Sequence, residues 1–519
     1  AIDDADPGDT INVYPGTYDE KLELNVPNIT VKSTDGATST TIDIPYDGSL
    51  TTGVKVLANM GDITFDGFKL INFTESGIIQ GMSQAEGTAF HVKNNILLPY
   101  NGYLRNGIQV SGDGSSVIGN TVQGAYLTDE WGSTAIGVVN ASDVLVQGNT
   151  VTGPGDYGIG AYTWGAYTDT GIRILENTIS GFDTAVSVDA YHGGSVSDVD
   201  VHENIITGYH AGMIARPYPG YGGVSVDDVD ATLNYWGYAC GPSLVIGDVS
   251  YSPWYVDDTL TTTSDTLGAP GTYNFAAGAT SEEMQADINC AAPGSVFNFV
   301  SGEYPGGLVV GRDGLTFNLE GVTVGSGSPA FDIYGDDITI NGPGTFDGAG
   351  SEDPAIYVNT GADNFILDGV EITGWDDGVY VEGEVESLKI VNNWIHTNTD
   401  AGLQVDATPT GVVTIEGNLF KVNGGNGVEF TPTTTGDQLN ATYNSWGADT
   451  GPGTVEEVGA DVLYDPWVFS EIYLDMDPAT TGDDYTATVT DQNGFEVAVM
   501  ADAENLSGLS FIFTYDTSR

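Results

Sequence analysis

A single asparagine pattern, repeated along the sequence, limits the folds open to this chain more than any other feature. In each copy, alternating apolar residues lead to an asparagine, often after Gly or Asn, and another apolar residue follows two positions later. Copies in a first series are 25, 29, 28, 27 and 30 residues apart, and copies in a second series are 25 and 26 apart. These periods are too long for a leucine-rich horseshoe and too short for a propeller blade. The asparagines are Asn95, Asn120, Asn149, Asn177, Asn204 and Asn234, then Asn393, Asn418 and Asn444.

Each repeat has room for two or three short strands but not for a helix. Around Asn149, the segments Val144–Val146, Val151 and Gly158–Tyr162 favour strands separated by turn residues. Strands without crossover helices must stack in parallel from one repeat to the next, as in a right-handed parallel β-helix. We therefore predict an all-β solenoid. We interpret the repeated asparagines as structural residues that hold corners, each bonding to its neighbours in adjacent coils.

The whole arrangement occurs twice, with matching motifs at both ends. Segment 7–18 matches 293–304, because both contain Pro-Gly, a strand pattern and Gly-x-Tyr. Segment 234–254, with Asn-x-Trp-Gly, Gly-Pro and Pro-Trp, matches 444–467. The starts are 286 residues apart (293 − 7) and the closing asparagines 210 apart (444 − 234), so the first solenoid is longer by 76 residues, or about three coils. We predict two consecutive β-helices at 1–258 and 280–469, joined by a linker at 259–279.

The ends of a solenoid expose an apolar cross-section and unpaired strand edges, which invite aggregation unless they are covered. Thr280 and Glu283 form a capping-box pattern ahead of Met284 and Ile288. We therefore expect a short amphipathic helix over the start of the second solenoid. The closing motifs supply a tryptophan for each of the other ends, Trp254 and Trp467.

Residues 470–519 carry strand-like runs without the repeat, which favours the start of an immunoglobulin-like or cohesin-like sandwich. About 50 residues are too few to close such a sandwich. We expect either that the polypeptide continues beyond this segment or that a neighbouring subunit supplies the missing strands.

The charge balance argues against two large classes of partner. Twelve Lys and Arg stand against 73 Asp and Glu, a formal net charge of −61, which repels phosphate backbones and anionic lipids. The sequence also has no run of 18 apolar residues, so we expect neither nucleic-acid binding nor membrane insertion within this segment. Five sequons are compatible with a secreted glycoprotein; their asparagines are Asn28, Asn72, Asn140, Asn440 and Asn505.

The motifs at the ends and in the coils resemble a known family. The Pro-Gly openings, the asparagine coils and the Asn-x-Trp-Gly closings look like pectate-lyase-like, NosD-type parallel β-helix repeats. The resemblance covers roughly residues 1–470 and implies the tandem solenoids of archaeal surface-layer, sheath and appendage proteins and of bacterial adhesins. It specifies the fold well and the function poorly, because the same solenoid carries lyases, hydrolases, epimerases and surface proteins.

An enzyme on this scaffold needs a reactive group of side chains on its long face. A polysaccharide lyase needs a basic residue beside carboxylates. The Asp376-Asp377-Gly378 segment is similar to the double-aspartate motif of polygalacturonases, but their Gly-His-Gly and Arg-x-Lys elements are absent. We interpret it as a turn and expect no enzymatic activity, with a polysaccharide lyase or hydrolase as the alternative. The candidate bases form no cluster in sequence register; they are Arg105, Arg173, Arg216, Arg312, Lys389 and Lys421.

Three successive coils of the first solenoid place aromatic and charged residues 12 to 15 positions after their asparagines, which predicts vertical stacking. This aromatic strip has three main interpretations: a protein interface, ordinary loop packing, or a surface that stacks on sugar rings. The matching positions of the second solenoid, Glu382, Asp406 and Thr431, are not aromatic, so we expect a local feature. The strip comprises Tyr162, Trp164, Tyr191, His192, Arg216 and Tyr218, with Tyr157, Tyr167, His210 and Tyr221 nearby.

Metal and disulfide candidates lie near the predicted domain junctions. An assembly of such acidic subunits must screen its charge, and Ca²⁺ with oxygen ligands would do so while joining domains or subunits. Asp475 and Asp477 are our candidate ligands. Cys240 follows the first closing motif and Cys290 falls in the predicted cap helix. These cysteines either form a disulfide that fastens one solenoid to the next or are two buried thiols.

We expect an extracellular structural protein of the cell surface, a subunit of a surface layer, sheath or filamentous appendage. Its β-helical rods would self-associate into a homopolymer. The alternative is a carbohydrate-active enzyme, or an adhesin that binds cell-surface glycans through the aromatic strip. Duplication of the scaffold without an intact catalytic set of residues favours the structural function.

Overall fold

The computed structural model divides the chain into two units. Unit 1 comprises Ala1–Ala269 and Ile288–Ala291, and unit 2 comprises Pro270–Asp287 and Ala292–Arg519. No helix among the described residues is long and apolar enough to cross a membrane. The structure describes residues 1–45, 50–57, 60–81, 89–100, 105–124, 132–218, 223–325, 327, 329–447, 451–453 and 456–467, together with the backbone of 472–475 and 498–501.

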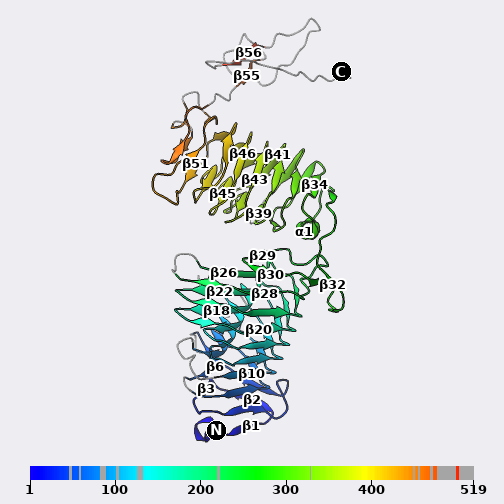
Figure 1. Cartoon of the computed structure of the whole chain (residues 1–519), viewed down its shortest axis with the longest axis vertical. Helices are drawn as coiled ribbons and strands as arrows, with labels where there is room; N and C mark the ends of the chain where they lie inside the picture. Colours follow the sequence, from blue (N-terminus) through cyan, green and yellow to red (C-terminus); the bar gives the residue numbers. More distant parts are fainter. Residues whose placement is uncertain are drawn as a thin grey trace. The chain divides into compact units, whose positions relative to one another are not determined.

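Unit 1 is built from three parallel sheets, to which successive coils contribute one strand each (Figure 1). The first sheet contains β1 (Thr10–Val13), β4 (Thr30–Ser33), β7 (Ile63–Asp66), β10 (Phe90–Lys93), β13 (Ser116–Ile118), β16 (Leu145–Gln147), β20 (Ile172–Leu175), β24 (Val199–His202), β28 (Val229–Asp230) and β30 (Val249–Ser250). The second contains β2 (Gly16–Asp19), β5 (Thr40–Asp43), β8 (Lys69–Ile71), β11 (Ile96–Leu98), β14 (Thr121–Gln123), β17 (Thr150–Thr152), β21 (Thr178–Ser180) and β25 (Ile205–Thr207). The third contains β3 (Leu22–Leu24), β6 (Thr52–Val56), β9 (Ser76–Gln80), β12 (Asn106–Val110), β15 (Thr134–Val139), β18 (Tyr157–Trp164), β22 (Thr184–Tyr191), β26 (Ala211–Pro217) and β29 (Val245–Ile246).

Smaller elements complete unit 1. A 3₁₀ turn, η1 (Ile2–Asp4), precedes β1. A short parallel sheet joins β19 (Thr168–Asp169), β23 (Ser195–Val196) and β27 (Ser225–Val226), and an antiparallel pair joins β31 (Trp254–Tyr255) and β32 (Thr263–Ser264).

Unit 2 repeats the three-sheet arrangement with fewer coils. Its first sheet contains β33 (Thr272–Phe275), β34 (Val296–Phe299), β37 (Thr316–Asn318), β40 (Thr339–Asn341), β43 (Phe365–Asp368), β46 (Leu388–Val391) and β49 (Val413–Glu416). The second contains β35 (Gly302–Tyr304), β38 (Val322–Val324), β41 (Gly344–Asp347), β44 (Glu371–Thr373), β47 (Trp394–His396) and β50 (Leu419–Lys421). The third contains β36 (Leu308–Val310), β39 (Phe331–Ile333), β42 (Ile356–Val358), β45 (Val379–Val381), β48 (Leu403–Val405), β51 (Asn426–Phe430) and β53 (Glu457–Val458), and a separate pair joins β52 (Leu439–Asn440) to β54 (Val462–Leu463).

Apolar residues stack in columns inside each unit because the register repeats from coil to coil. In the first sheet of unit 1, each of five inward residues is the register partner of the next. All five are 0% exposed, and burying an aliphatic side chain stabilises a fold by about 1.5–3 kcal/mol. The column consists of Val92, Val117, Val146, Ile174 and Val201.

The predicted asparagine ladder is confirmed in both units. Asn149 donates from Nδ2 to Asn177 Oδ1 at 2.9 Å, and the Asn149 backbone N–H donates to the same oxygen at 2.9 Å. In unit 2, Asn393 donates in the same way to Asn418 Oδ1 at 2.9 Å. The nine ladder asparagines are at most 2% exposed. Since an unsatisfied buried polar group costs about 1–3 kcal/mol, a slipped register would leave every rung with that cost.

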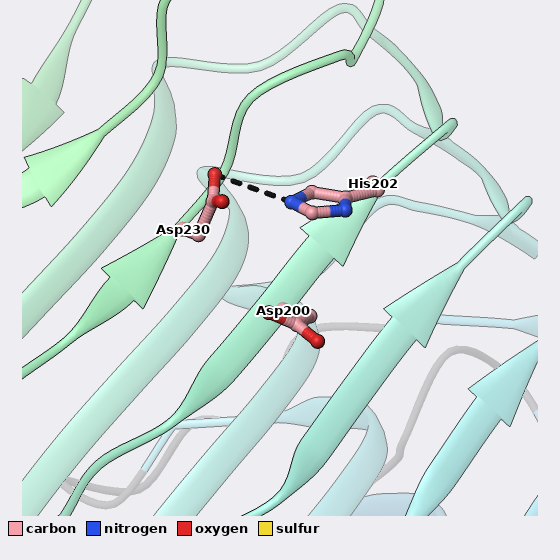
Figure 2. Close-up of side chains that lie close together, drawn as sticks. All are labelled: Asp200, His202 and Asp230. Atoms are coloured by element: carbon pink, nitrogen blue, oxygen red, sulfur yellow. Dashed lines mark ion pairs between the residues drawn. The ribbon is translucent and has the colours of Figure 1, made fainter.

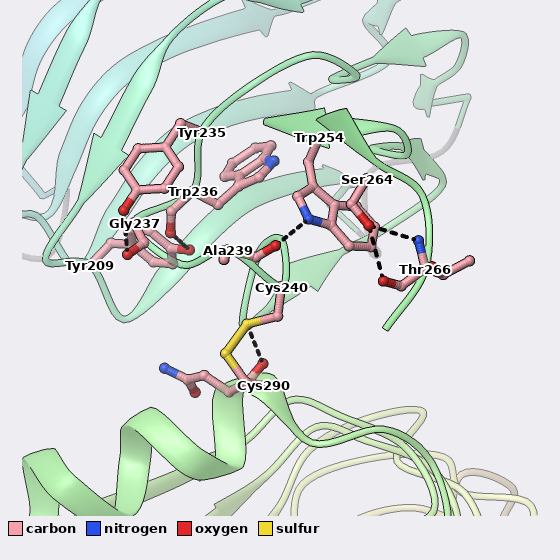
Figure 3. Close-up of a disulfide and its surroundings, with 11 residues drawn as sticks. Tyr209, Tyr235, Trp236, Gly237, Ala239, Cys240, Trp254, Ser264, Thr266 and Cys290 are labelled. Carbon is pink, nitrogen blue, oxygen red and sulfur yellow. Dashed lines mark hydrogen bonds between the residues drawn. A yellow bond between two sulfur atoms is a disulfide. The ribbon is translucent and has the colours of Figure 1, made fainter. Parts of the chain in front are cut away.

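Both closing motifs bury a tryptophan at the same position. Trp236 and Trp446 are 0% exposed at equivalent positions of the two units. As predicted, Trp254 is buried, with 3% of its surface exposed, and its Nε1 donates to the carbonyl oxygen of Ala239 at 3.0 Å (Figure 3). Trp467 is only partly buried. The closing motif therefore supplies one fully buried tryptophan in each unit and a second one that differs between the units.

The predicted cap helix is α1 (Ser281–Cys290). Its capping box is formed, because the Glu283 N–H donates to Thr280 Oγ1 at 3.2 Å and the Thr280 N–H donates to Glu283 Oε2 at 3.1 Å. Met284 and Ile288 lie one helical turn apart and are 0% exposed. The capping pattern and the apolar spacing therefore identified both the start of the helix and its buried face.

The segment that we predicted as a linker, 259–279, contains strands, which corrects our interpretation. β33 pairs in parallel with β34, and Tyr273 is the register partner of Phe297. The reason is visible in the sequence, because Thr-Tyr-Asn-Phe repeats the pattern of Val-Phe-Asn-Phe. β33 thus extends the first sheet of unit 2, and the units divide between residues 269 and 270.

Only two strands of 470–519 are described. β55 (Ile472–Asp475) pairs antiparallel with β56 (Ala498–Ala501). The other residues of the predicted immunoglobulin-like or cohesin-like sandwich lie outside the described part of the chain, so that domain stays a prediction.

Candidate functional site

The predicted aromatic strip lies on the outer face of the third sheet of unit 1. Val186, Val188 and Ala190 of β22 point into the core, so the alternate residues Asp189 and Tyr191 point outward. Two rows run across the strands in register. Tyr162, Asp189 and Arg216 form one row, and Trp164 and Tyr191 lie side by side in the next.

The outer rings of the strip contact one another as the equal offsets predicted. The Tyr191 and Tyr218 rings are stacked with centroids 4.2 Å apart, and the Trp164 centroid lies 5.1 Å from that of Tyr191. The His192 ring lies 4.5 Å from Trp164. Aromatic pairs at these separations add about 0.5–1.5 kcal/mol beyond the area that they bury. The side chains thus form a continuous, partly exposed aromatic surface.

A buried ion pair lies within the strip, and sequence analysis missed its acidic member. Arg216 Nε lies 3.3 Å from Asp189 Oδ1, and the Asp189 side chain is 1% exposed while that of Arg216 is 35% exposed. Asp189 Oδ2 has no hydrogen-bond partner among the described residues. Burial raises the pKa of Asp189 to about 7, although the Arg216 guanidinium opposes the shift. Asp189 follows Asn177 by 12 residues, as Arg216 follows Asn204 by 12, so the offset rule could have identified it.

Other predicted members of the strip have different roles. Tyr162 is partly buried, and its hydroxyl and that of Thr134 are hydrogen-bonded at 2.6 Å; burial also raises its pKa. Tyr162 therefore supports the surface from below. Tyr157 lies edge-on to Tyr162 at 6.5 Å, and Tyr167 is 40% exposed. His210 is exposed, and Tyr221 lies outside the described residues.

The third sheet of unit 2 carries a different pair of aromatic residues, at other positions than Glu382, Asp406 and Thr431, and the local character of the strip stays a prediction. Tyr357 and Tyr380 are register partners with ring centroids 5.0 Å apart. The Tyr380 hydroxyl donates to Asp406 Oδ2 at 2.7 Å. Burial raises the pKa of Tyr357, and the nearby Glu382 carboxylate raises it further. This tyrosine–carboxylate face was missed because the buried asparagine ladder of unit 2 begins only at Asn393, so it gave no spacing for the preceding coils.

The Asp376-Asp377-Gly378 segment forms a bend, in agreement with the turn interpretation. Asp377 is only 8% exposed, and its Oδ1 accepts the Ala401 N–H at 2.9 Å. The pKa of Asp377 is raised to about 7, mainly by burial. The hydrogen bond from Ala401 lowers this pKa, and the nearby charges of Asp400, Asp376 and Glu429 raise it. The turn therefore also holds a buried carboxyl group.

The candidate bases are dispersed, as expected. Arg216 joins the aromatic strip, while Arg173 pairs with Asp200 at 3.6 Å on the first sheet. Arg312 is 7% exposed, and Lys389 and Lys421 lie on β46 and β50 of unit 2.

Cys240 and Cys290 form a disulfide (Figure 3). The bond joins the segment after Trp236 to the last residue of α1, across a sequence separation of 50 residues. Of the two alternatives left open by the sequence, the structure has the disulfide.

The remaining sequence-based candidates fare differently. Asn140 is 5% exposed and its Oδ1 accepts the Trp164 N–H, so a glycan does not fit there in the folded chain and we withdraw this site. Asn28 and Asn440 are exposed and Asn72 is partly exposed, while Asn505 lies outside the described residues. Of the calcium candidates, Asp475 is described by its backbone alone and Asp477 is not described.

Comparisons with known proteins address the fold. A family described as "Right handed beta helix region" matches residues 304–445. No curated protein matches the chain. Among solved structures, the catalytic unit of a thermostable GH87 alpha-1,3-glucanase from Streptomyces thermodiastaticus strain HF3-3 is 12% identical with a TM-score of 0.29; the match covers 89% of this chain and 64% of that one. The PL6 family alginate lyase AlyGC is 10% identical with a TM-score of 0.20, over 89% of this chain and 98% of that one.

The likeness to these enzymes is too weak to bear on activity. The present chain spans 64% of the length of the glucanase unit. The family match over residues 304–445 and the stacked parallel sheets together support a parallel β-helix repeat fold for this chain.

Proposed function

We propose that the chain is a non-enzymatic, extracellular structural protein, two β-helical rods in tandem, that self-associates into a surface layer, sheath or filament. The observation that carries this proposal is the duplication of the interior. Sheets, asparagine ladder and buried closing tryptophan are built twice. A repeated scaffold suits a structural protein, whereas an enzyme requires one complete site.

The composition supports the same proposal. With a net charge of −61, subunits repel one another in dilute buffer, and divalent cations that bridge carboxylates would reduce this repulsion. The disulfide favours an oxidising, extracellular compartment. We therefore propose that calcium or a similar cation promotes assembly.

Electron microscopy of the purified full chain tests the structural function. Samples over a range of protein and Ca²⁺ concentrations should contain filaments or sheets whose repeat is the same in every particle. Light scattering recorded on the same samples should rise with assembly. Monodisperse monomers under every condition would contradict the proposal.

The aromatic strip favours a second candidate function, glycan binding by an adhesin. Its rings are stacked and partly exposed, and the arginine of the strip, Arg216, is paired with Asp189. Such a surface suits neutral sugar rings, which stack on aromatic faces, better than uronates, which the overall negative charge repels.

Intrinsic fluorescence can follow this binding, because Trp164 belongs to the strip. Neutral oligosaccharides should change the emission, and Tyr191→Ala should abolish the change. Tyr380→Ala, on the equivalent sheet of unit 2, is the matched control and should leave it intact. If neither neutral nor acidic oligosaccharides change the emission, glycan binding by the strip is excluded; unsaturated products from an acidic polysaccharide would instead reveal a lyase.

A further inference from the structure

A group of three side chains lies on the first sheet of unit 1, on a different sheet from the aromatic strip. Asp200 and His202 are two residues apart on β24, so they share one face of the strand. Asp230 of β28 is the register partner of Asp200. One ligand atom of each side chain lies within 4.8 Å of the other two, which occurs in no other such group among the described residues. Figure 2 shows the three side chains on neighbouring strands.

The group contains an imidazole, which distinguishes it from the acidic patches elsewhere on the chain. His202 Nε2 lies 3.2 Å from Asp230 Oδ1, as drawn in Figure 2. The Thr232 N–H donates to the same carboxylate oxygen at 2.9 Å.

We infer that Asp200, His202 and Asp230 bind a divalent transition-metal ion of the Zn²⁺ class. Imidazole nitrogen and carboxylate oxygen suit this class, whereas Ca²⁺ and Mg²⁺ take oxygen ligands. Three protein ligands leave room for water in the remaining coordination position. All three side chains are partly exposed, so an ion reaches them without unfolding of the chain. Small side-chain rotations would bring the three ligand atoms closer together around the ion.

Arg173 is the natural competitor of the ion. Its Nε lies 3.6 Å from Asp200 Oδ2, and its side chain is 61% exposed. A metal ion can therefore displace the guanidinium into water without leaving a buried charge. Removing Arg173 should therefore tighten metal binding. A substitution that merely disturbed the local structure would weaken it.

Isothermal titration with Zn²⁺, in excess Ca²⁺ to occupy ordinary carboxylates, tests the inference. We expect one zinc per chain, at least tenfold weaker in His202→Asn and in Asp200→Asn, and tighter in Arg173→Gln. His396→Asn is the matched control, because His396 Nε2 lies 3.1 Å from Glu371 Oε1 without a third ligand atom among the described residues. Equal losses in the two histidine variants, or no zinc binding above the Ca²⁺ background, would overturn the inference.

Nuclear magnetic resonance gives a second readout, which identifies the histidine that binds the ion. The chain has five histidines, and the variant His202→Asn identifies the imidazole signal of His202. Substoichiometric Co²⁺ should shift or broaden that signal first. Proportional changes in all five histidines would show adsorption to the acidic surface and would contradict a built site. Neither experiment depends on whether the chain assembles or binds glycans.

Discussion

The third sheet of unit 1 presents stacked rings and one buried ion pair, whereas the third sheet of unit 2 presents two tyrosines among carboxylates. Their interiors share three features. Both units stack apolar columns, bury an asparagine ladder (six residues in unit 1 and three in unit 2) and bury a tryptophan in the closing motif. Both units also bury a tryptophan indole N–H, of Trp236 and of Trp446, that has no hydrogen-bond partner in the described part of the chain.

This contrast separates what specifies the fold from what specifies the surface. The inward residues are constrained by stacking and hydrogen bonding from coil to coil, so a change at one level affects its neighbours. The outward residues face solvent or one another, so each unit can present a different chemistry on the same coils. Differences in function between the units are therefore to be sought on the outer faces.

The largest effect should come from breaking the shared interior. Asn177→Ala and Asn418→Ala each leave several buried amide groups without partners, and each should cost about 3 kcal/mol of unfolding free energy. Chemical denaturation measures both losses. Asn318→Ala is the control, because Asn318 lies in a ladder on the partly exposed outer face, between Asn298 and Asn341, and should cost under about 1 kcal/mol. A large difference between the two interior variants would contradict a shared interior.

The next effect should distinguish the two outer faces. Arg216→Met leaves Asp189 as a buried carboxylate without its cation. The substitution should lower the free energy of unfolding by about 2 kcal/mol at pH 8, which is less than for a fully buried pair because Arg216 is partly exposed. At pH 5 Asp189 is protonated, since its pKa is about 7, so the loss should shrink. Arg173→Met removes an exposed pair and should change stability little at either pH. Equal losses at pH 5 and pH 8 would contradict this assignment.

The pH dependence of stability should be shared by the two units. The pKa values of Asp189, Asp377 and Glu456 are each raised to about 7 by burial, above their ordinary values near 4. Between about pH 4 and pH 7 the folded chain binds more protons than the unfolded chain, so stability falls as pH rises through this window. Thermal unfolding should therefore occur at a higher temperature at pH 5 than at pH 8. Asp189→Asn and Asp377→Asn should each flatten the dependence, and a higher unfolding temperature at pH 8 would contradict the shifts.

The smallest effect concerns the tyrosine–carboxylate face of unit 2. Tyr380→Phe keeps the ring and removes the hydrogen bond to Asp406, which should cost about 0.5–1.5 kcal/mol. Denaturant titrations resolve such a difference when the variant and the parent are measured side by side. Tyr443→Phe, at a 52% exposed ring, is the control and should be neutral.

The interior could be predicted from the sequence because its signals are local and periodic. Spacing alone located the ladder from Asn95 to Asn234, and four residues, Thr280 to Glu283, indicated the start of α1. The same spacing also predicts a row of polar side chains on the first sheet. It consists of three residues that each precede a ladder asparagine by four positions and therefore lie side by side on successive strands, Arg173, Asp200 and Asp230.

The outer faces were harder to predict because they depend on loop lengths between sheets. Asp189 was missed although its offset matched that of Arg216, since an aspartate between valine and alanine reads as ordinary solvent-facing surface. Tyr357 and Tyr380 lie in coils that precede the buried asparagine ladder of unit 2, so the spacing of that ladder did not connect them. The burial of Asn140 depends on packing against Trp164, which a sequon does not reveal.

Hydrogen exchange tests the central claim, one interior built twice, most directly. The account predicts two separate blocks of slowly exchanging amides, around Asn149 and Asn177 in unit 1 and around Asn393 and Asn418 in unit 2, with similar protection in both. Fast exchange at the ladder amides of either unit, while the other strand amides of that unit stay protected, would contradict the account.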